Sequence, residues 1–234
     1  FTGSTDVAWN INQTLGQRQC AIVPLIAETG GINAMIVDSS ALPEQVVTDI
    51  ITSAFQSAGQ RCSALRILFI QEDIADKILT MLAGAMQQLR VSHPASLSTD
   101  VGAVIDKVAQ QELLAHIDYL KETARLIATA PEHLEQQIGC FILPQAWEIS
   151  SAAALTKEVF GPILHVVRFK SGEIEQVIDQ INAKGFGLTL GLHSRIDETI
   201  NLVRKKARVG NFYVNRNMIG AVVGVQPFGG EGLS

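Results

Sequence analysis

The chain has 234 residues, enough for one large domain or two modest ones. Its formal net charge is −5 and no basic run is interleaved with aromatic residues, so the composition argues against nucleic-acid binding. No apolar stretch approaches the ~20 residues that cross a bilayer, and the three cysteines cannot all pair and lack metal-ligand spacing. We therefore expect a cytoplasmic protein with reduced cysteines, no transmembrane segment and no metal site.

The hydrophobic pattern predicts alternating strands and helices, which is typical of an α/β sheet protein. The first apolar, strand-like run covers residues 22–27 and stops at Glu28, which two glycines follow. A strand that ends in this way would present the acid at the carboxyl edge of a sheet, where open α/β folds bind ligands. On its own, Glu28 would be taken as a solvated loop residue.

A strand predicted over 33–38 leads into an amphipathic helix that starts near Pro43. Its apolar residues recur at i, i+3 and i+4 spacing, and Gly59 ends it as a glycine after a helix terminus would. The later pattern predicts strands over 64–70, 163–169, 188–192 and 210–215, and helices over 74–90, 108–128, 173–183 and 197–207.

Cys62 follows this helix in the segment Gly59-Gln60-Arg61-Cys62-Ser63 and lies between Arg61 and Arg66 in the sequence. A thiol is a good nucleophile only as the thiolate, and neighbouring cations lower the thiol pKa below its free value of about 8.5. The pattern therefore favours a reactive cysteine. The alternative is a small buried apolar residue near a helix end, which is a common place for a free cysteine.

An acid before Gly-Gly and a cysteine after Gly-Gln-x, in this order and spacing, resemble the NAD(P)-dependent aldehyde dehydrogenases. The resemblance implies that Glu28 is the general base and Cys62 the nucleophile. Two further motifs extend it: Phe1-Thr2-Gly3-Ser4 is similar to the family's turn at a helix start, and Glu158-Val159-Phe160-Gly161-Pro162 is similar to its Glu-x-Phe-Gly-Pro motif.

These motifs imply a binding site for NAD. By the resemblance, Gly3 and Ser4 meet the cofactor pyrophosphate at the helix start, where backbone N–H groups favour an anion. Glu158 holds the nicotinamide-ribose hydroxyls and Phe160 borders the nicotinamide. The resemblance also assigns Thr29 and Gly30 to cofactor binding.

Within the family, the segments 59–66 and 213–224 most resemble the L-glutamate γ-semialdehyde (Δ1-pyrroline-5-carboxylate) dehydrogenases of bifunctional proline-utilisation proteins. The resemblance implies that Ser63, Gly220 and Ala221 anchor the substrate carboxylate, because a glycine-rich loop exposes N–H donors to an anion. It places Phe228, in Pro-Phe-Gly-Gly, on the substrate side of the site. Gly220 is equally compatible with a turn that needs a positive φ.

The resemblance also predicts the domain organisation. Residues 1–60 would be the C-terminal half of a Rossmann-like NAD-binding domain, and residues 61–234 an α/β catalytic domain of aldehyde dehydrogenase type, truncated at its C-terminus. We expect the chain to be a fragment of a larger homo-oligomeric protein with a proline dehydrogenase domain fused upstream. The missing upstream part would supply an asparagine of the oxyanion hole.

The implied reaction is oxidation of L-glutamate γ-semialdehyde to L-glutamate with NAD⁺, through a cysteine thiohemiacetal and thioester, in the second step of proline catabolism. Three alternatives stay open: a related dehydrogenase with another aldehyde substrate, an inactive fragment or scaffold module, and a cysteine hydrolase or acyltransferase. The last usually needs a histidine base. None of the five histidines lies near Glu28 or Cys62 in the sequence; they are His93, His116, His133, His165 and His193.

Overall fold

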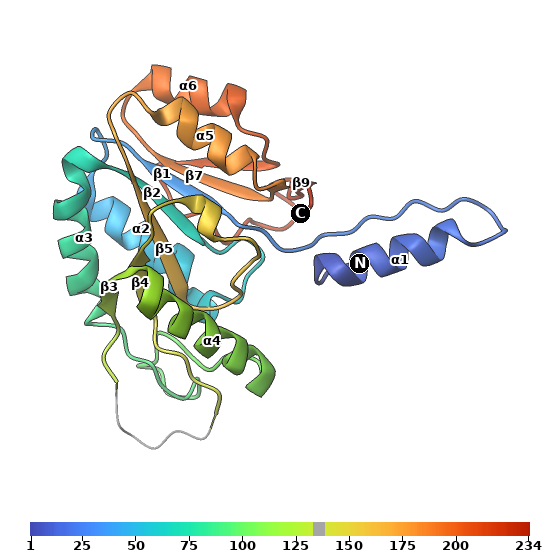
Figure 1. Cartoon of the computed structure of the whole chain (residues 1–234), viewed down its shortest axis with the longest axis horizontal. Coiled ribbons are helices and arrows are strands. Elements are labelled where there is room, and N and C mark those ends of the chain that lie inside the picture. The colour runs from blue at the N-terminus through green and yellow to red at the C-terminus, as the bar shows by residue number, and fades with distance from the viewer. Residues whose placement is uncertain (133–138) are drawn as a thin grey trace.

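The chain folds into a mixed sheet with helices on both faces, as Figure 1 shows for the computed structural model. The structure describes residues 1–132 and 139–234. Within them, the strands of the central sheet are β1 (Ala34–Val37), β2 (Ile67–Gln71), β3 (Arg125–Thr129), β4 (Gln145–Glu148), β5 (Ile163–Phe169), β7 (Thr189–His193) and β8 (Asn211–Val214). Their order is β3-β4-β5-β2-β1-β7-β8, in which β3 and β4 are antiparallel and all other neighbours are parallel.

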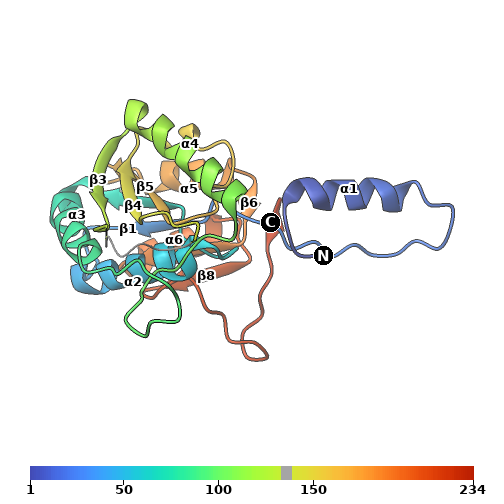
Figure 2. The same cartoon turned by 90° about the horizontal axis from the view of Figure 1, so that it is seen from below.

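Helices cover both faces of this sheet (Figures 1 and 2). The helices of the body are α2 (Pro43–Phe55), α3 (Glu72–Met86), α4 (Lys107–Thr123), α5 (Ile174–Asn182) and α6 (Asp197–Lys206). Helices α2 and α3 pack together on one face, and α5 and α6 pack together on the other. The central strands β1 and β2 are therefore buried along their whole length, which explains why they appear in the sequence as continuous apolar runs.

The predicted α/β class is confirmed, and every strand and helix predicted after residue 32 is present with adjusted ends. One prediction needs correction, because the helix predicted over 108–128 stops at Thr123. The backbone of Ala124 is extended, with φ −137° and ψ 166°, and the next residues form β3. Strand β3 pairs with β4, which was not predicted at all. Tertiary pairing at the sheet edge thus overrides the helical pattern there.

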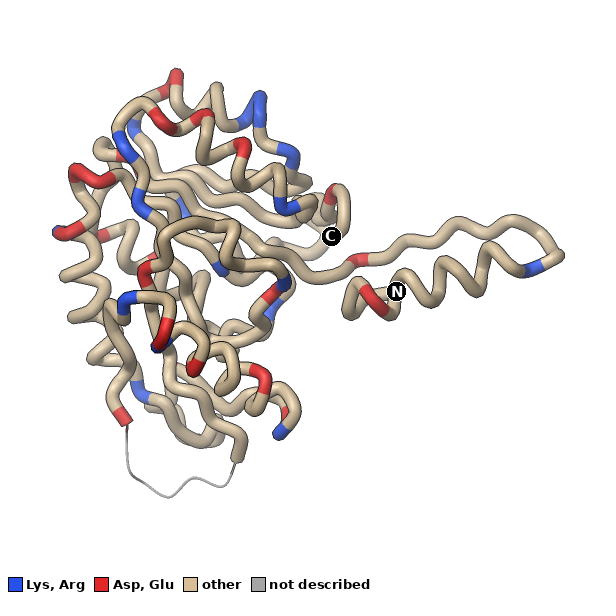
Figure 3. Tube along the Cα trace, in the orientation of Figure 1, with Lys and Arg blue, Asp and Glu red and all other residues tan. Residues whose placement is uncertain are grey.

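The first thirty residues form an arm that projects from the body (Figures 1 and 2). It consists of α1 (Thr5–Gly16) and a returning extended segment, and the strand predicted over 22–27 is wrong: this segment joins no sheet. Ile22 is fully exposed and Ile26 is 73% exposed, so no neighbouring strand or helix covers them. Figure 3 shows how few charged residues the arm carries. Exposed apolar surface of this kind is typical of a contact surface.

The elements on both sides of Gln60 belong to the same body. Strand β1 lies at the centre of the sheet between β2 and β7, and α2 packs on α3. Met35 before Gln60 and Phe69 after it are both completely buried in one core. The structure therefore has no break in packing at residue 60, where we predicted a domain boundary. The change from the exposed arm to the buried body falls close to Thr29, which is 4% exposed.

The C-terminal segment returns to the body of the protein. Strand β6 (Phe186–Gly187) pairs with β9 (Glu231–Gly232) in an antiparallel pair that holds the C-terminal segment against the body.

Among the described residues, no helix has the length and apolar character that a membrane crossing requires. The same residues contain no cluster of three or more histidine, cysteine or acidic side chains placed to hold a metal ion.

Candidate active site

Cys62 lies in a loop whose entry has an unusual backbone. Helix α2 ends at Phe55, earlier than predicted, and Ser57, Ala58 and Gly59 then adopt positive φ values of 56°, 53° and 66°. Such conformations are rare for residues with a side chain and cluster at functional sites. Gly59 is also required by space, because a Cβ atom there would lie 2.3 Å from the carbonyl oxygen of Gly161.

A buried arginine connects this loop to the segment that carries Glu158. The side chain of Arg66 is 1% exposed, and its Nη2 atom lies 3.0 Å from Oε1 of Glu158. Its Nη1 atom donates to the carbonyl oxygen of Gly59 at 2.7 Å, and Nη2 donates to that of Arg61 at 3.1 Å. The guanidinium also lies 5.1 Å from the centre of the Phe160 ring. Arg66 therefore joins the nucleophile loop to the two residues predicted to hold the nicotinamide end of the cofactor.

The thiol pKa of Cys62 is not lowered, as the neighbouring arginines led us to expect, but raised. Burial raises the pKa of the Cys62 thiol, and the negative charges of Glu158 and Glu28 raise it further. Arg66 is engaged by Glu158, and Arg61 donates to the hydroxyl of Ser57 in an exposed position. Hydrogen bonds from backbone N–H groups oppose the rise without reversing it. Burial therefore outweighs any effect of the arginines, and the prediction that the pKa of this thiol lies below its ordinary value is wrong.

Glu28 lies beside the site at the end of the arm. Its backbone N–H donates to Phe1 and its carbonyl accepts from Gly3, which fixes the acid beside the start of α1. Its Oε2 atom is buried without a hydrogen-bond partner among the described residues, and Oε1 is 3.5 Å from where a Cβ atom of Gly229 would be. A buried carboxylate oxygen without a partner has free capacity to accept a proton or hydrogen bond.

The site lies at the amino edge of the sheet, and not at the carboxyl edge as predicted. Glu28 leads into β1, Cys62 into β2 and Glu158 into β5, and these three strands are parallel. The prediction failed because residues 22–27 belong to the exposed arm and form no strand of the sheet. Glu28 thus precedes the first strand of the sheet and does not end one.

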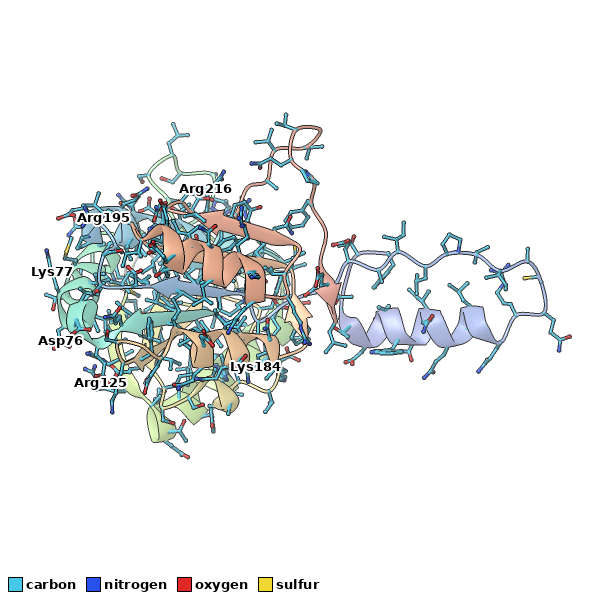
Figure 4. All side chains as sticks on the ribbon, turned by 90° about the horizontal axis from the view of Figure 1, so that it is seen from above. Asp76, Lys77, Arg125, Lys184, Arg195 and Arg216 are labelled. Carbon is cyan, nitrogen blue, oxygen red and sulfur yellow. The ribbon has the colours of Figure 1, made fainter. Side chains whose placement is uncertain are left out.

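The predicted substrate residues meet in one open pocket of about 430 Å³. Its lining residues are Gln60, Arg61, Cys62, Ser63, Gly220, Ala221, Val222, Val223, Gln226 and Phe228. Gly220 has a φ of +75°, so it also has the backbone conformation of a turn glycine. In the part of the chain that the structure describes, the backbone N–H groups of Gly220 and Ala221 donate to no protein acceptor. Figure 4 labels Arg216, at the base of the loop that carries them.

The predicted cofactor residues fall into two groups. Glu158 and Phe160 adjoin the nucleophile loop, and a Cβ atom on Gly30 would lie 1.7 Å from Oε2 of Glu158, so Gly30 allows the carboxylate to approach the backbone. Burial raises the pKa of the Glu158 carboxyl, and the Arg66 guanidinium opposes this rise. A carboxyl group that can accept hydrogen bonds from hydroxyl groups, beside an exposed aromatic ring, suits a ribose and its base, so this half of the site fits a nicotinamide nucleotide.

The second group lies at the start of α1. Ser4 is the N-cap of this helix, and its hydroxyl accepts from the N–H of Val7 at 3.4 Å. The Thr29 hydroxyl accepts from Thr5 and donates to the carbonyl oxygen of Leu233. Thr29 is therefore engaged in joining α1 to the C-terminal segment. No described contact joins these residues to Glu158.

The described histidines do not provide a base for Cys62. His116 and His165 face each other with their Nε2 atoms 2.8 Å apart, and His193 lies beside Asp49. His93 accepts from the N–H of Ala95 through its Nδ1 atom. His133 lies outside the described residues. Among those described, no histidine hydrogen-bonds to Cys62 or Glu28, which argues against the cysteine hydrolase alternative.

Comparison with known proteins assigns the family. The profile of the aldehyde dehydrogenase family matches residues 1–234. The chain belongs to this family. As an aldehyde dehydrogenase chain, it is 55% identical over 242 aligned residues to the bifunctional protein PutA of Escherichia coli (strain K12), and the match covers all of this chain and 18% of that protein.

Solved structures agree with this aldehyde dehydrogenase assignment. A mutant of proline utilisation A from Bradyrhizobium japonicum matches with a TM-score of 0.96 and 57% identity, over 100% of this chain and 24% of that one. The 1-pyrroline-5-carboxylate dehydrogenase from Thermus with bound NAD matches with a TM-score of 0.91 and 33% identity, over 100% of this chain and 45% of that one. The chain therefore spans less than half the length of these relatives.

Sequence reasoning missed Asn33, which touches the nucleophile loop. Asn33 donates from Nδ2 to the carbonyl oxygens of Cys62 and Ala64. It was assigned only to the start of a strand. The sequence did contain a signal for this role. Asn33 is a polar residue between the acid-Gly-Gly segment and an apolar strand, and its side chain does not fit an apolar strand face.

Proposed function

We propose that this protein oxidises L-glutamate γ-semialdehyde to L-glutamate with NAD⁺. The observation that carries the proposal is the pocket that Cys62 lines together with Gly220 and Ala221, whose N–H groups donate to no acceptor among the described residues. A nucleophilic sulfur beside donors for an anion suits an aldehyde that also carries a carboxylate. The similarity to PutA and to 1-pyrroline-5-carboxylate dehydrogenases supports this substrate class.

In the proposed reaction, the Cys62 thiolate attacks the aldehyde carbon and forms a thiohemiacetal. The backbone N–H of Cys62 is a candidate donor to the oxyanion. Bound NAD⁺ would supply the hydride acceptor for this carbon, and the Cys62 sulfur would then hold the acyl group as a thioester. Glu28 then takes a proton from water, the resulting hydroxide attacks the thioester carbon, and the acid product and the thiolate are released. The free Oε2 atom of Glu28 supports this role.

The remaining residues bind and orient. We assign the substrate carboxylate to Gly220, Ala221 and the hydroxyl of Ser63, with Phe228 covering the substrate side. Glu158 would accept hydroxyl groups of the nicotinamide ribose, and the exposed ring of Phe160 would border the nicotinamide. Gly3 and Ser4 would meet the pyrophosphate at the start of α1, beside Thr29. Gly30 would contribute on the nicotinamide side, where it lets the Glu158 carboxylate approach the backbone.

A further part of the proposal concerns the larger protein to which this chain belongs. We infer that it acts within a larger, cytoplasmic, homo-oligomeric protein with a fused proline dehydrogenase domain. The small share of PutA that the chain covers, 18%, supports this inference. The exposed apolar side chains of the arm, among them Trp9 and Ile22, support contacts with further protein.

A comparison of two aldehydes tests the proposal. We would measure kcat/KM with NAD⁺ for glutamate γ-semialdehyde and for butyraldehyde, which lacks the carboxylate and the amine. A preference of several hundredfold for the semialdehyde would support the assignment of Ser63, Gly220 and Ala221 to its carboxylate. This ratio corresponds to roughly 3 kcal/mol, the loss expected when a charged group has no hydrogen-bonded site. Equal use of both would leave a dehydrogenase for another aldehyde. No NADH with either aldehyde would favour the scaffold alternative.

A further inference from the structure

Three consecutive carbonyl groups of the nucleophile loop are held by two buried side chains. The Nδ2 atom of Asn33 donates to the carbonyl oxygen of Cys62 at 2.6 Å and to that of Ala64 at 2.9 Å. The hydroxyl of Thr189 donates to the carbonyl oxygen of Ser63 between them at 3.2 Å. The carbonyl groups of the loop are therefore directed into the protein.

Asn33 is itself fixed. Its side chain is almost completely buried, and its Oδ1 atom accepts from the backbone N–H of Thr189 at 3.2 Å. Both functional groups of the amide are thus engaged, so the orientation of the side chain is determined by its partners. Strand β1, which starts at Ala34, and strand β7, which starts at Thr189, are neighbours in the sheet and provide a rigid base.

The direction of one carbonyl determines the direction of the next N–H group. A trans peptide is planar, so the C=O of Cys62 and the N–H of Ser63 point to opposite sides of the chain. Because Asn33 holds the carbonyl of Cys62 inward, the N–H of Ser63 faces outward. This N–H group is one of the two backbone groups whose hydrogen bonding lowers the pKa of the Cys62 thiol, against the effect of burial.

We propose that Asn33 is a positioning residue for the nucleophile, because it orients the peptide between Cys62 and Ser63 so that the Ser63 N–H stabilises the developing charge on the sulfur. This inference deepens the proposed function, in which Cys62 is the nucleophile. It adds Asn33 as the group that aims a backbone donor at the reacting atom. A second residue, Thr189, supports the same loop but fixes the next peptide.

The test uses alkylation of Cys62 in the full-length protein, without aldehyde or NAD⁺. The rate of reaction with iodoacetamide is followed as a function of pH by mass spectrometry of the peptide that contains Cys62. Asn33→Ser keeps one hydroxyl donor, and Asn33→Ala removes all donors. The matched control is Asn182→Ser, because Asn182 also joins two backbone groups through its amide but lies at the end of α5.

We expect both Asn33 variants to raise the thiol pKa of Cys62 by about one unit, so that alkylation below that pKa slows about tenfold. The Asn182→Ser protein should retain the wild-type profile. A profile unchanged by both Asn33 variants would overturn the proposal. So would the loss of folded protein in both variants by circular dichroism, since Asn33 would then be a residue of the fold alone. The result does not depend on the substrate, so failure of the aldehyde assignment leaves this test intact.

Discussion

The guanidinium of Arg66 and the carboxylate of Glu158 form an ion pair of 3.0 Å between residues that lie 92 positions apart. Arg66 is buried, while Glu158 is 18% exposed. Taking one partner away from a buried ion pair leaves an uncompensated charge, which typically costs about 3–5 kcal/mol. This pair therefore couples the stability of the protein to the geometry of its cofactor side.

We expect Arg66→Met to lower the free energy of unfolding by about 3–5 kcal/mol, measured by urea denaturation. The matched control is Arg168→Met, because Arg168 also forms ion pairs, with Asp76 and Glu148, but its side chain is 24% exposed. That change should cost about 1 kcal/mol or less. If the double variant Arg66→Met/Glu158→Gln is no more stable than Arg66→Met alone, the cost does not come from the unpaired acid.

The raised thiol pKa of Cys62 predicts an alkaline reactivity profile. Burial is the largest cause, followed among the causes that raise it by the charges of Glu158 and Glu28. In the protein without aldehyde or NAD⁺, the alkylation rate at Cys62 should keep rising as the pH passes the ordinary thiol pKa of about 8.5. Glu28→Gln should shift the profile to lower pH, whereas Glu175→Gln on α5 should not. A profile that is unchanged in the Glu28 variant contradicts the proximity of this charge.

The same shift has a consequence for stability. The folded state binds the Cys62 proton more tightly than the unfolded state does, because the folded-state pKa is the higher one. The resulting stabilisation is present below the unfolded-state pKa and is lost as the pH rises through the folded-state pKa. Cys62→Ala should therefore reduce the loss of stability that the wild-type protein shows above pH 9, measured by thermal denaturation across this range.

The sequence was sufficient to predict the α/β class and to bring Cys62, Ser63 and Gly220 into one site. Strand and helix periods are local, and the motifs of the family are contiguous. The edge of the sheet that carries the site was predicted wrongly, because whether residues 22–27 join a sheet depends on partners distant in the sequence. The pKa of Cys62 was also predicted wrongly. Sequence places Arg66 near the thiol, but only the fold shows that Glu158 engages it.

Glu28→Gln should separate the two halves of the proposed reaction. Without a base, hydrolysis of the thioester should slow by about 10²–10⁴-fold, while formation of the thioester still releases NADH. Rapid mixing with aldehyde and NAD⁺ should then show a burst of about one NADH per active site, followed by a slow steady state. Glu175→Gln serves as the control with normal turnover. Loss of the burst as well would place Glu28 before the thioester.

Gly59 offers a test of the loop that precedes the nucleophile. Gly59→Ala introduces a Cβ atom at 2.3 Å from the carbonyl oxygen of Gly161, at a φ of +66°. Gly172→Ala is the matched control, because Gly172 has a φ of +86° and nothing within 4 Å of the new atom. Both changes strain the backbone by about 1 kcal/mol, but only the first adds a steric clash, which should cost a further 1–3 kcal/mol or so. Urea denaturation measures this difference, and equal costs for the two variants would show that the loop moves freely away from Gly161.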